Sequence, residues 1–176
     1  GTTASALVIA PEGAMIGHVG DSRVYRLRDG VLEQLTFDHS LVWEMEASGK
    51  SGVNYPKNVI TRSLGPNPQV EIDIEGPMPV QVGDCYLVCS DGLTGLVEDT
   101  ELGPLMECLP EEKLVRVLVD LANLRGGPDN ISVVVARIHE PPGASGNSST
   151  TNKRKSTNPA PKAMLFTAIA CLVAAG

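Results

Sequence analysis

The sequence predicts an α+β domain in which antiparallel strands come first and helices follow. Four short apolar runs succeed one another before residue 37, and turn residues separate them. A later segment, 111–124, has apolar residues at helical spacing. Only 3% of the residues are aromatic, so valine, isoleucine and leucine must fill the interior. Such an interior fits strands packed face to face or beneath helices.

Each of the four N-terminal runs is a predicted strand, and they span 4–10, 14–19, 23–28 and 31–36. Pro11-Glu12-Gly13 joins the first pair and Asp29-Gly30 joins the last pair. Both connections are typical of tight hairpin turns, so each pair is expected to be antiparallel.

A short helix is predicted over 41–47. Asp38 or Ser40 would cap its first turn, and Ser48-Gly49 would end it. The following segment, 49–57, is polar and rich in turn residues.

The second half of the chain is predicted to hold two strands and a longer helix. Residues 70–74 alternate as a strand does, and 84–89 reads as a buried strand. In the helix over 111–124, one face would carry Leu114, Val115, Leu118, Leu121 and Ala122. That helix is expected to end before Gly126-Gly127.

Three aspartates stand beside apolar, β-rich runs. Asp21 and Asp91 each follow such a run, and Asp129 precedes one. They are therefore expected where strands enter or leave a sheet, and together they would make a cation site. Carboxylate oxygens are hard ligands suited to Mg²⁺ or Mn²⁺, which indicates phosphoryl or hydrolytic chemistry.

The segments around these aspartates occur in one consistent order. They are Gly20-Asp21-Ser22-Arg23, Asp38-His39-Ser40, Ile60-Thr61-Arg62-Ser63-Leu64-Gly65, Ser90-Asp91-Gly92 and Gly127-Pro128-Asp129-Asn130-Ile131. In this order they resemble the metal-dependent protein serine/threonine phosphatases of the PPM type, also called type 2C. The resemblance covers nearly all of residues 1–138.

The resemblance implies a fold, a reaction and a set of metal ligands. The fold would be an antiparallel β-sandwich flanked by helices, the αββα phosphatase fold. The reaction would be hydrolysis of phosphoserine and phosphothreonine by metal-activated water. Asp91 and Asp129 would hold the catalytic pair of Mn²⁺ or Mg²⁺ ions, and Asp21 with Asp91 would bind a third, weaker ion.

The resemblance also implies that the domain is incomplete at its N-terminus. The family's first half carries a phosphate-binding arginine, an early aspartate and an Asp-Gly-x-Gly-Gly motif, and this chain contains none of them. No catalytic residue is therefore assigned in this chain, and the fragment alone is expected to be inactive. The alternative is a non-catalytic pseudophosphatase that serves as a membrane-tethered binding module.

Three residues are expected to support the site. Gly92 would let the backbone turn sharply beside Asp91, and Asn130 would orient Asp129 or tie its turn. Arg23 could pair with Asp21 or a neighbouring carboxylate, or it could meet a phosphate. We favour the ion pair, because the family's phosphate-binding arginine lies upstream.

Composition divides the chain into the phosphatase-like part, 1–139, a linker, 140–162, and an apolar end, 163–176. All 21 acidic residues lie within 1–140, so the body is a poor binder of nucleic acid. The linker is rich in Pro, Ser, Thr and Asn and carries Lys153-Arg154-Lys155.

The apolar end is predicted to begin a transmembrane helix, with a docked or interfacial tail as the alternative. The basic residues before it would make a single-pass protein with its phosphatase domain in the cytoplasm. The expected partners are proteins phosphorylated on serine or threonine, with a cognate serine/threonine kinase.

Overall fold

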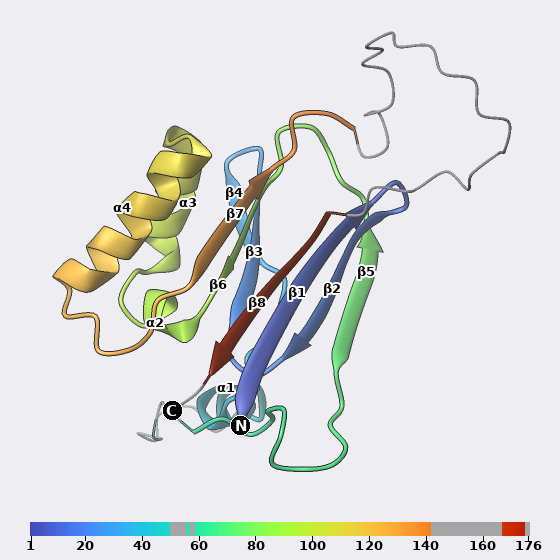
Figure 1. Ribbon diagram of the computed structural model, residues 1–176, viewed down its shortest axis with the longest axis vertical. Helices are drawn as coiled ribbons and strands as arrows, with labels where there is room; N and C mark the ends of the chain where they lie inside the picture. The colour runs from blue at the N-terminus through green and yellow to red at the C-terminus, as the bar shows by residue number, and fades with distance from the viewer. Residues whose placement is uncertain (50–55, 57–58, 142–166, 175–176) are drawn as a thin grey trace, which may run out of the picture.

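A computed structural model describes residues 1–49, 56, 59–141 and 167–174, the last range by its backbone. Two four-stranded antiparallel sheets pack against each other, and helices cover one outer face (Figure 1). The mixed α+β fold with antiparallel sheets confirms the predicted class. In the described part of the chain, the helical layer lies on one side only.

The first sheet has the order β5-β2-β1-β8. Its strands are β1 (Thr2–Ala10), β2 (Gly13–Val19), β5 (Asp73–Met78) and β8 (Thr167–Ala174). Ala10 pairs with Gly13 across the predicted hairpin. Strand β5 begins three residues later than the predicted 70–74, because its pairing with β2 fixes its position, from His18–Asp73 to Ala14–Met78.

The second sheet has the order β4-β3-β6-β7. Its strands are β3 (Arg23–Arg28), β4 (Val31–Gln34), β6 (Cys85–Cys89) and β7 (Val133–Arg137). Between the two sheets lies a core that includes Leu7, Ile16, Val24, Tyr86 and Val88.

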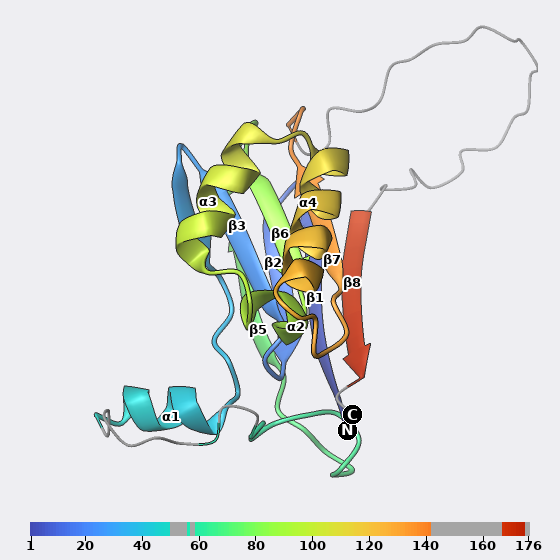
Figure 2. The same ribbon diagram turned by 90° about the vertical axis from the view of Figure 1, so that its left-hand side faces the viewer.

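The helices α3 (Asp99–Cys108) and α4 (Glu111–Leu124) cover the outer face of the second sheet, as Figure 2 shows from the side. Leu114, Leu118 and Ala122 of α4 are buried in a second core against this sheet. The bounds of α4 are those predicted, because its apolar residues follow one helical stripe. The one-turn helix α2 (Asp91–Thr94) and helix α3 were not predicted.

Helix α1 (Leu41–Ala47) also has the predicted bounds. Of the two predicted caps, Ser40 is the one used, since its side chain accepts a hydrogen bond from Trp43 N. No residue of α1 is buried, and the helix lies beside one end of the sheets in both views (Figures 1 and 2).

The predicted start of a transmembrane helix over 163–176 is wrong for its described residues. Thr167–Ala174 form strand β8, which pairs with β1 from Thr2–Ala174 to Ile9–Thr167. An unpaired edge of β1 would leave backbone donors and acceptors open, and a segment with β-branched residues can pair with them. No helix in the described ranges is both long enough and apolar enough to cross a membrane. The predicted linker lies almost entirely outside these ranges.

Candidate metal centre

The three predicted aspartates lie at one end of the second sheet. Asp21 precedes β3, Asp91 follows β6, and Asp129 lies in the loop before β7. Arg23 pairs with Cys89, and Cys89 pairs with Val133. Since these strands are antiparallel, the beginnings of β3 and β7 lie beside the end of β6. The strand pairing therefore brings together carboxylates from three distant parts of the sequence.

All three carboxylates line one cleft of about 670 Å³. The cleft is also lined by residues of α1 and by Gly92, Thr94 and Gly95 of the α2 segment. Asp21 and Asp91 are partly buried, whereas Asp129 is exposed. The arrangement leaves the carboxylates open to a ligand that enters from solvent.

Burial and the crowding of negative charge perturb the pKa of two of these carboxyl groups. Burial and then the charge of Asp91 raise the pKa of Asp21 to about 6. Burial and then the charge of Asp129 raise the pKa of Asp91. A divalent cation among them would offset this repulsion, so the donor chemistry fits Mn²⁺ or Mg²⁺.

The described residues do not by themselves form a complete ion-binding cluster. No group of three or more His, Cys, Asp or Glu side chains within them is placed to hold one metal ion together. Magnesium and its analogues require about six oxygen ligands in near-octahedral geometry. The three aspartates can thus supply part of a coordination shell.

Ser90 ties the segment of Asp91 to the segment of Asp129. Its hydroxyl donates to Asn130 O at 2.9 Å and accepts from Ser132 N at 2.9 Å. The main chain adds a bond from Ser90 N to Ser132 O at 3.0 Å. We call these three hydrogen bonds the Ser90 clamp. Ser90 is fully buried, so the clamp is shielded from water. It was not assigned a role from the sequence, although it belongs to the Ser90-Asp91-Gly92 motif.

Gly92 and Asn130 meet at the same clamp. A Cβ at position 92 would lie 2.4 Å from Asn130 O, which no real side chain tolerates. Asn130 also contacts Asp129, since its main-chain N–H donates to Asp129 Oδ1 at 2.7 Å. Gly92 therefore lies where the loop of Asp91 approaches the loop of Asp129. Asn130 contacts Asp129 through its backbone and not through its side chain.

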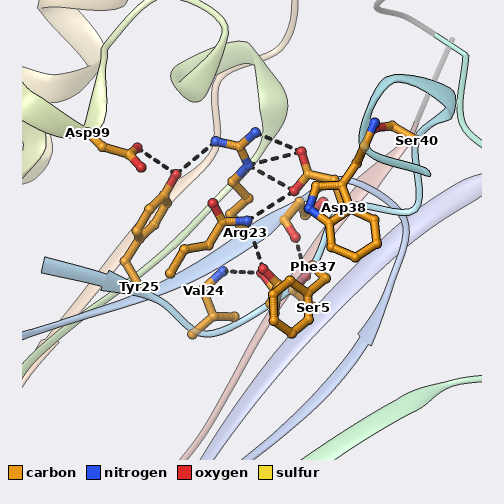
Figure 3. A network of polar contacts seen from close by, with 12 residues as sticks. Ser5, Arg23, Val24, Tyr25, Phe37, Asp38, Ser40 and Asp99 are labelled. Atoms are coloured by element: carbon orange, nitrogen blue, oxygen red, sulfur yellow. Dashed lines mark hydrogen bonds and ion pairs between the residues drawn. The ribbon is translucent and has the colours of Figure 1, made fainter. Parts of the chain in front are cut away.

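Arg23 pairs with Asp38, not with Asp21. Its Nε lies 2.9 Å from Asp38 Oδ1 and its Nη2 lies 2.7 Å from Asp38 Oδ2 (Figure 3). Its Nη1 donates to Tyr25 Oη at 3.0 Å, and that hydroxyl donates to Asp99 Oδ1 at 2.9 Å. Burial works to lower the pKa of Arg23, but these hydrogen bonds outweigh it and raise the pKa.

Asp38 is a site residue that sequence reasoning missed. It was considered only as a helix cap, yet it lines the cleft and binds Arg23. The pairing joins residues 15 apart and exists only because β3 and the segment before α1 lie side by side. The presence of Asp38 beside His39 and Ser40 in the family-like motif was the available signal.

Two histidines, His18 and His39, form hydrogen bonds at this end of the sheets. Gly20 N donates to His39 Nδ1 at 3.0 Å, so the proton of the neutral ring is on Nε2, which donates to Asp73 Oδ2 at 2.9 Å. His18 is buried, with Nε2 donating to Phe37 O at 3.0 Å. Its pKa is lowered, chiefly by burial and then by His39. Both are hydrogen-bonded structural residues.

The chain is similar to bacterial serine/threonine phosphatases. No family model matches it. It is 42% identical over 143 residues to serine/threonine phosphatase stp of Listeria monocytogenes, across 77% of this chain and 56% of the relative. It is 35% identical over 146 residues to protein phosphatase PhpP of Streptococcus pneumoniae, across 80% of this chain and 59% of the relative.

A solved structure gives the same result. The catalytic domain of the serine threonine protein phosphatase PstP in complex with two manganese ions matches with a TM-score of 0.66 and 33% identity. The match covers 77% of this chain and 58% of that one. Relatives and structural neighbours support the PPM-type serine/threonine phosphatase family for this chain. The chain spans about half the length of the curated relatives it matches, 56% for stp, and so covers part of the domain.

Proposed function

We propose that the protein containing this chain is a metal-dependent protein serine/threonine phosphatase. One observation carries the proposal: Asp21, Asp91 and Asp129 line a single cleft in a chain 42% identical to a serine/threonine phosphatase. Its substrates would be phosphomonoesters of serine and threonine in proteins.

Asp91 and Asp129 would hold two Mn²⁺ or Mg²⁺ ions, and Asp21 with Asp91 would hold a third, weaker ion. Such ions supply two effects: they lower the pKa of water and screen the negative charge of the phosphate. The Ser90 clamp keeps the segments of Asp91 and Asp129 at a fixed separation, and Gly92 permits their close approach. Arg23 is already engaged by Asp38, so we assign it a positioning role at the rim of the cleft.

The remaining ligands and the catalytic groups would come from the part of the domain that this chain does not cover. Residues 1–138 alone should therefore hydrolyse p-nitrophenyl phosphate no faster than Mn²⁺ without protein. Strong metal-dependent turnover by that fragment would show that the site is complete without further residues.

The test of the proposed function uses the full-length protein and a phosphothreonine peptide with Mn²⁺. Asp91→Asn keeps the shape of the side chain and removes its charge, so kcat/KM should fall about 100-fold or more. Asp120→Asn removes an exposed carboxylate of α4, outside the cleft, and should leave kcat/KM unchanged. A wild-type protein that binds the peptide without releasing phosphate would instead be a binding module, and the enzyme proposal would fail.

Partners and location remain predictions of the sequence. A cognate serine/threonine kinase would supply the substrates, since this reaction consumes what a kinase produces. The predicted position at the cytoplasmic face of a membrane depends on the basic residues near Lys153, since the described part of the apolar run after them forms strand β8 and not a helix. Fractionation of cells that express the full-length protein checks it: recovery in the high-speed supernatant would contradict membrane attachment.

A further inference from the structure

An exposed pair of aromatic rings lies at the edge of the cleft. The ring centroids of Phe37 and Trp43 are 5.3 Å apart and the ring planes are tilted by 43°. Phe37 is 56% exposed and Trp43 is 39% exposed, and Trp43 lines the cleft together with Asp21, Asp91 and Asp129. We call Phe37 and Trp43 the aromatic pair.

The aromatic pair does not belong to either core. Helix α1, which carries Trp43, has no buried residue, so packing does not explain a tryptophan here. Exposed aromatic rings at a cleft are typical of binding surfaces, because they offer a large contact area at low entropic cost.

The backbone around the aromatic pair is fixed relative to the carboxylates. Phe37 O accepts a hydrogen bond from the buried His18 ring, and the next residue, Asp38, binds Arg23. Ser40 caps α1, and Leu41 N donates to Val59 O at 2.9 Å. The rings are therefore presented at a defined place beside the cleft.

The cleft favours positive charge. Among the described residues Arg23 is the only cation that lines the cleft, and its charge is paired with Asp38. Glu46 of α1 lines the same wall as Trp43 and has no ion pair in the described part of the chain. Among the described residues five carboxylates line the cleft against one arginine, an excess of negative charge to which a phosphate dianion would add. A cationic side chain next to the phosphorylated residue would offset that excess.

We propose that the aromatic pair and Glu46 form a subsite for an arginine or lysine side chain beside the phosphorylated residue of a protein substrate. The cation would lie against the face of Trp43 and approach the carboxylate of Glu46. The inference rests on the proposed phosphatase function, which it refines by naming the kind of phosphoprotein that the cleft selects.

Binding can be measured without turnover. Trp43 is the one tryptophan of this chain, so its fluorescence reports directly on the subsite. The protein to use is the full-length Asp91→Asn variant, and the signal is the difference from the same variant carrying Trp43→Phe. Titration with a phosphothreonine peptide that has arginine next to the phosphorylated residue should change this signal, at lower concentrations than an otherwise identical alanine peptide. Equal titration curves for the two peptides would overturn the proposal.

Kinetics provide the second measurement. The wild-type protein should show a kcat/KM about 3- to 10-fold higher for the arginine peptide than for the alanine peptide. Trp43→Leu and Glu46→Gln should each reduce this ratio towards one. Glu12→Gln, which removes an exposed carboxylate in the turn between β1 and β2, is the matched control and should keep the ratio.

The outcomes separate this inference from the proposed function. If the wild-type protein hydrolyses p-nitrophenyl phosphate but does not distinguish the peptides, the phosphatase function stands and the subsite is wrong. If Trp43→Leu keeps the full preference for arginine, the subsite is also wrong. If no phosphate is released from any substrate, the enzyme proposal fails, and the fluorescence titration still decides whether a cation binds at Trp43.

Discussion

Arg23 binds Asp38 through one edge of its guanidinium group, the edge formed by Nε and Nη2. The Nε–Oδ1 distance is 2.9 Å and the Nη2–Oδ2 distance is 2.7 Å, a bidentate pair at the rim of the cleft. Their side chains are 26% and 11% exposed, so water screens the pair only in part. The pair joins the start of β3 to the segment that leads into α1.

The first prediction concerns this pair. Asp38→Ala should lower the free energy of unfolding by about 3 kcal/mol, because it leaves the charge of Arg23 partly buried without a partner. The measurement is urea denaturation of the full-length protein.

Glu33→Ala is the control, since it breaks the ion pair between Arg26 and Glu33, whose glutamate side chain is 53% exposed. It should cost less than about 1 kcal/mol. If both variants lose the same free energy of unfolding, the Arg23–Asp38 pair contributes no more to stability than an exposed ion pair.

The second prediction concerns acid stability. Asp84 is buried and accepts hydrogen bonds from Arg28 Nε at 2.7 Å and Arg28 Nη2 at 2.6 Å. Burial works to raise the pKa of Asp84, but Arg28 and the N–H of Gln81 outweigh it and hold the pKa below its ordinary value. The stabilisation is thus present above about pH 4 and is lost as the pH falls through the lowered pKa.

Removal of the Arg28 guanidinium should change how the free energy of unfolding depends on pH. Arg28→Met should lower stability at pH 7 by about 3 kcal/mol, and the gap from the wild-type protein should narrow as the pH falls from 5 to 2. Urea denaturation at each pH measures the gap. A gap that stays constant across this range would contradict the assignment of the acid sensitivity to Asp84.

The third prediction compares two helical glycines. Gly92→Ala should destabilise the protein by more than 2 kcal/mol and reduce activity, because its Cβ would meet Asn130 O at 2.4 Å and spread the loops of Asp91 and Asp129. A Cβ at Gly103 would meet only Leu32 Cβ, at an ordinary 3.6 Å. Gly103→Ala should therefore be neutral or stabilising by up to about 1 kcal/mol. Thermal unfolding of both variants tests the contrast.

The fourth prediction concerns metal dependence. After removal of metal with a chelator, Mn²⁺ titration should restore phosphatase activity to the wild-type protein. Asp129→Asn should abolish this recovery almost entirely, whereas Asp21→Asn should mainly raise the Mn²⁺ concentration needed, because Asp21 would serve the weaker ion. If Asp21→Asn proves as damaging as Asp129→Asn, the division between catalytic and weaker ions is wrong.

Elements with strong local signals could be predicted from the sequence. Strand β3 and helices α1 and α4 have the predicted bounds, since hairpin residues, caps and a 3.6-residue apolar period are all local features. The clustering of Asp21, Asp91 and Asp129 was also expected from the sequence, because each stands beside an apolar strand-like run. The division of these residues among the metal ions came from the family resemblance.

Helix α3 and strand β8 were not predicted, because the local sequence pattern does not show the interactions that determine them. Helix α3 contains Pro104, which normally argues against a helix interior. Its capping box, formed by Glu98 and Glu101, was the signal that could have revealed it. Strand β8 was predicted as helix because an uncharged apolar run carries no period, and only the edge of β1 selects the extended form.

The hydrogen bonds of Ser90 couple the loop of Asp91 to the loop of Asp129, although the two aspartates are 38 positions apart in the sequence. Any substitution that alters the shape of one loop must be accommodated by the other, through Asn130 O and Ser132 N. In a chimaera with a related phosphatase, residues 89–93 and 129–133 should therefore be exchanged together. An exchange of either segment alone would pair one protein's loop with a partner shaped for another.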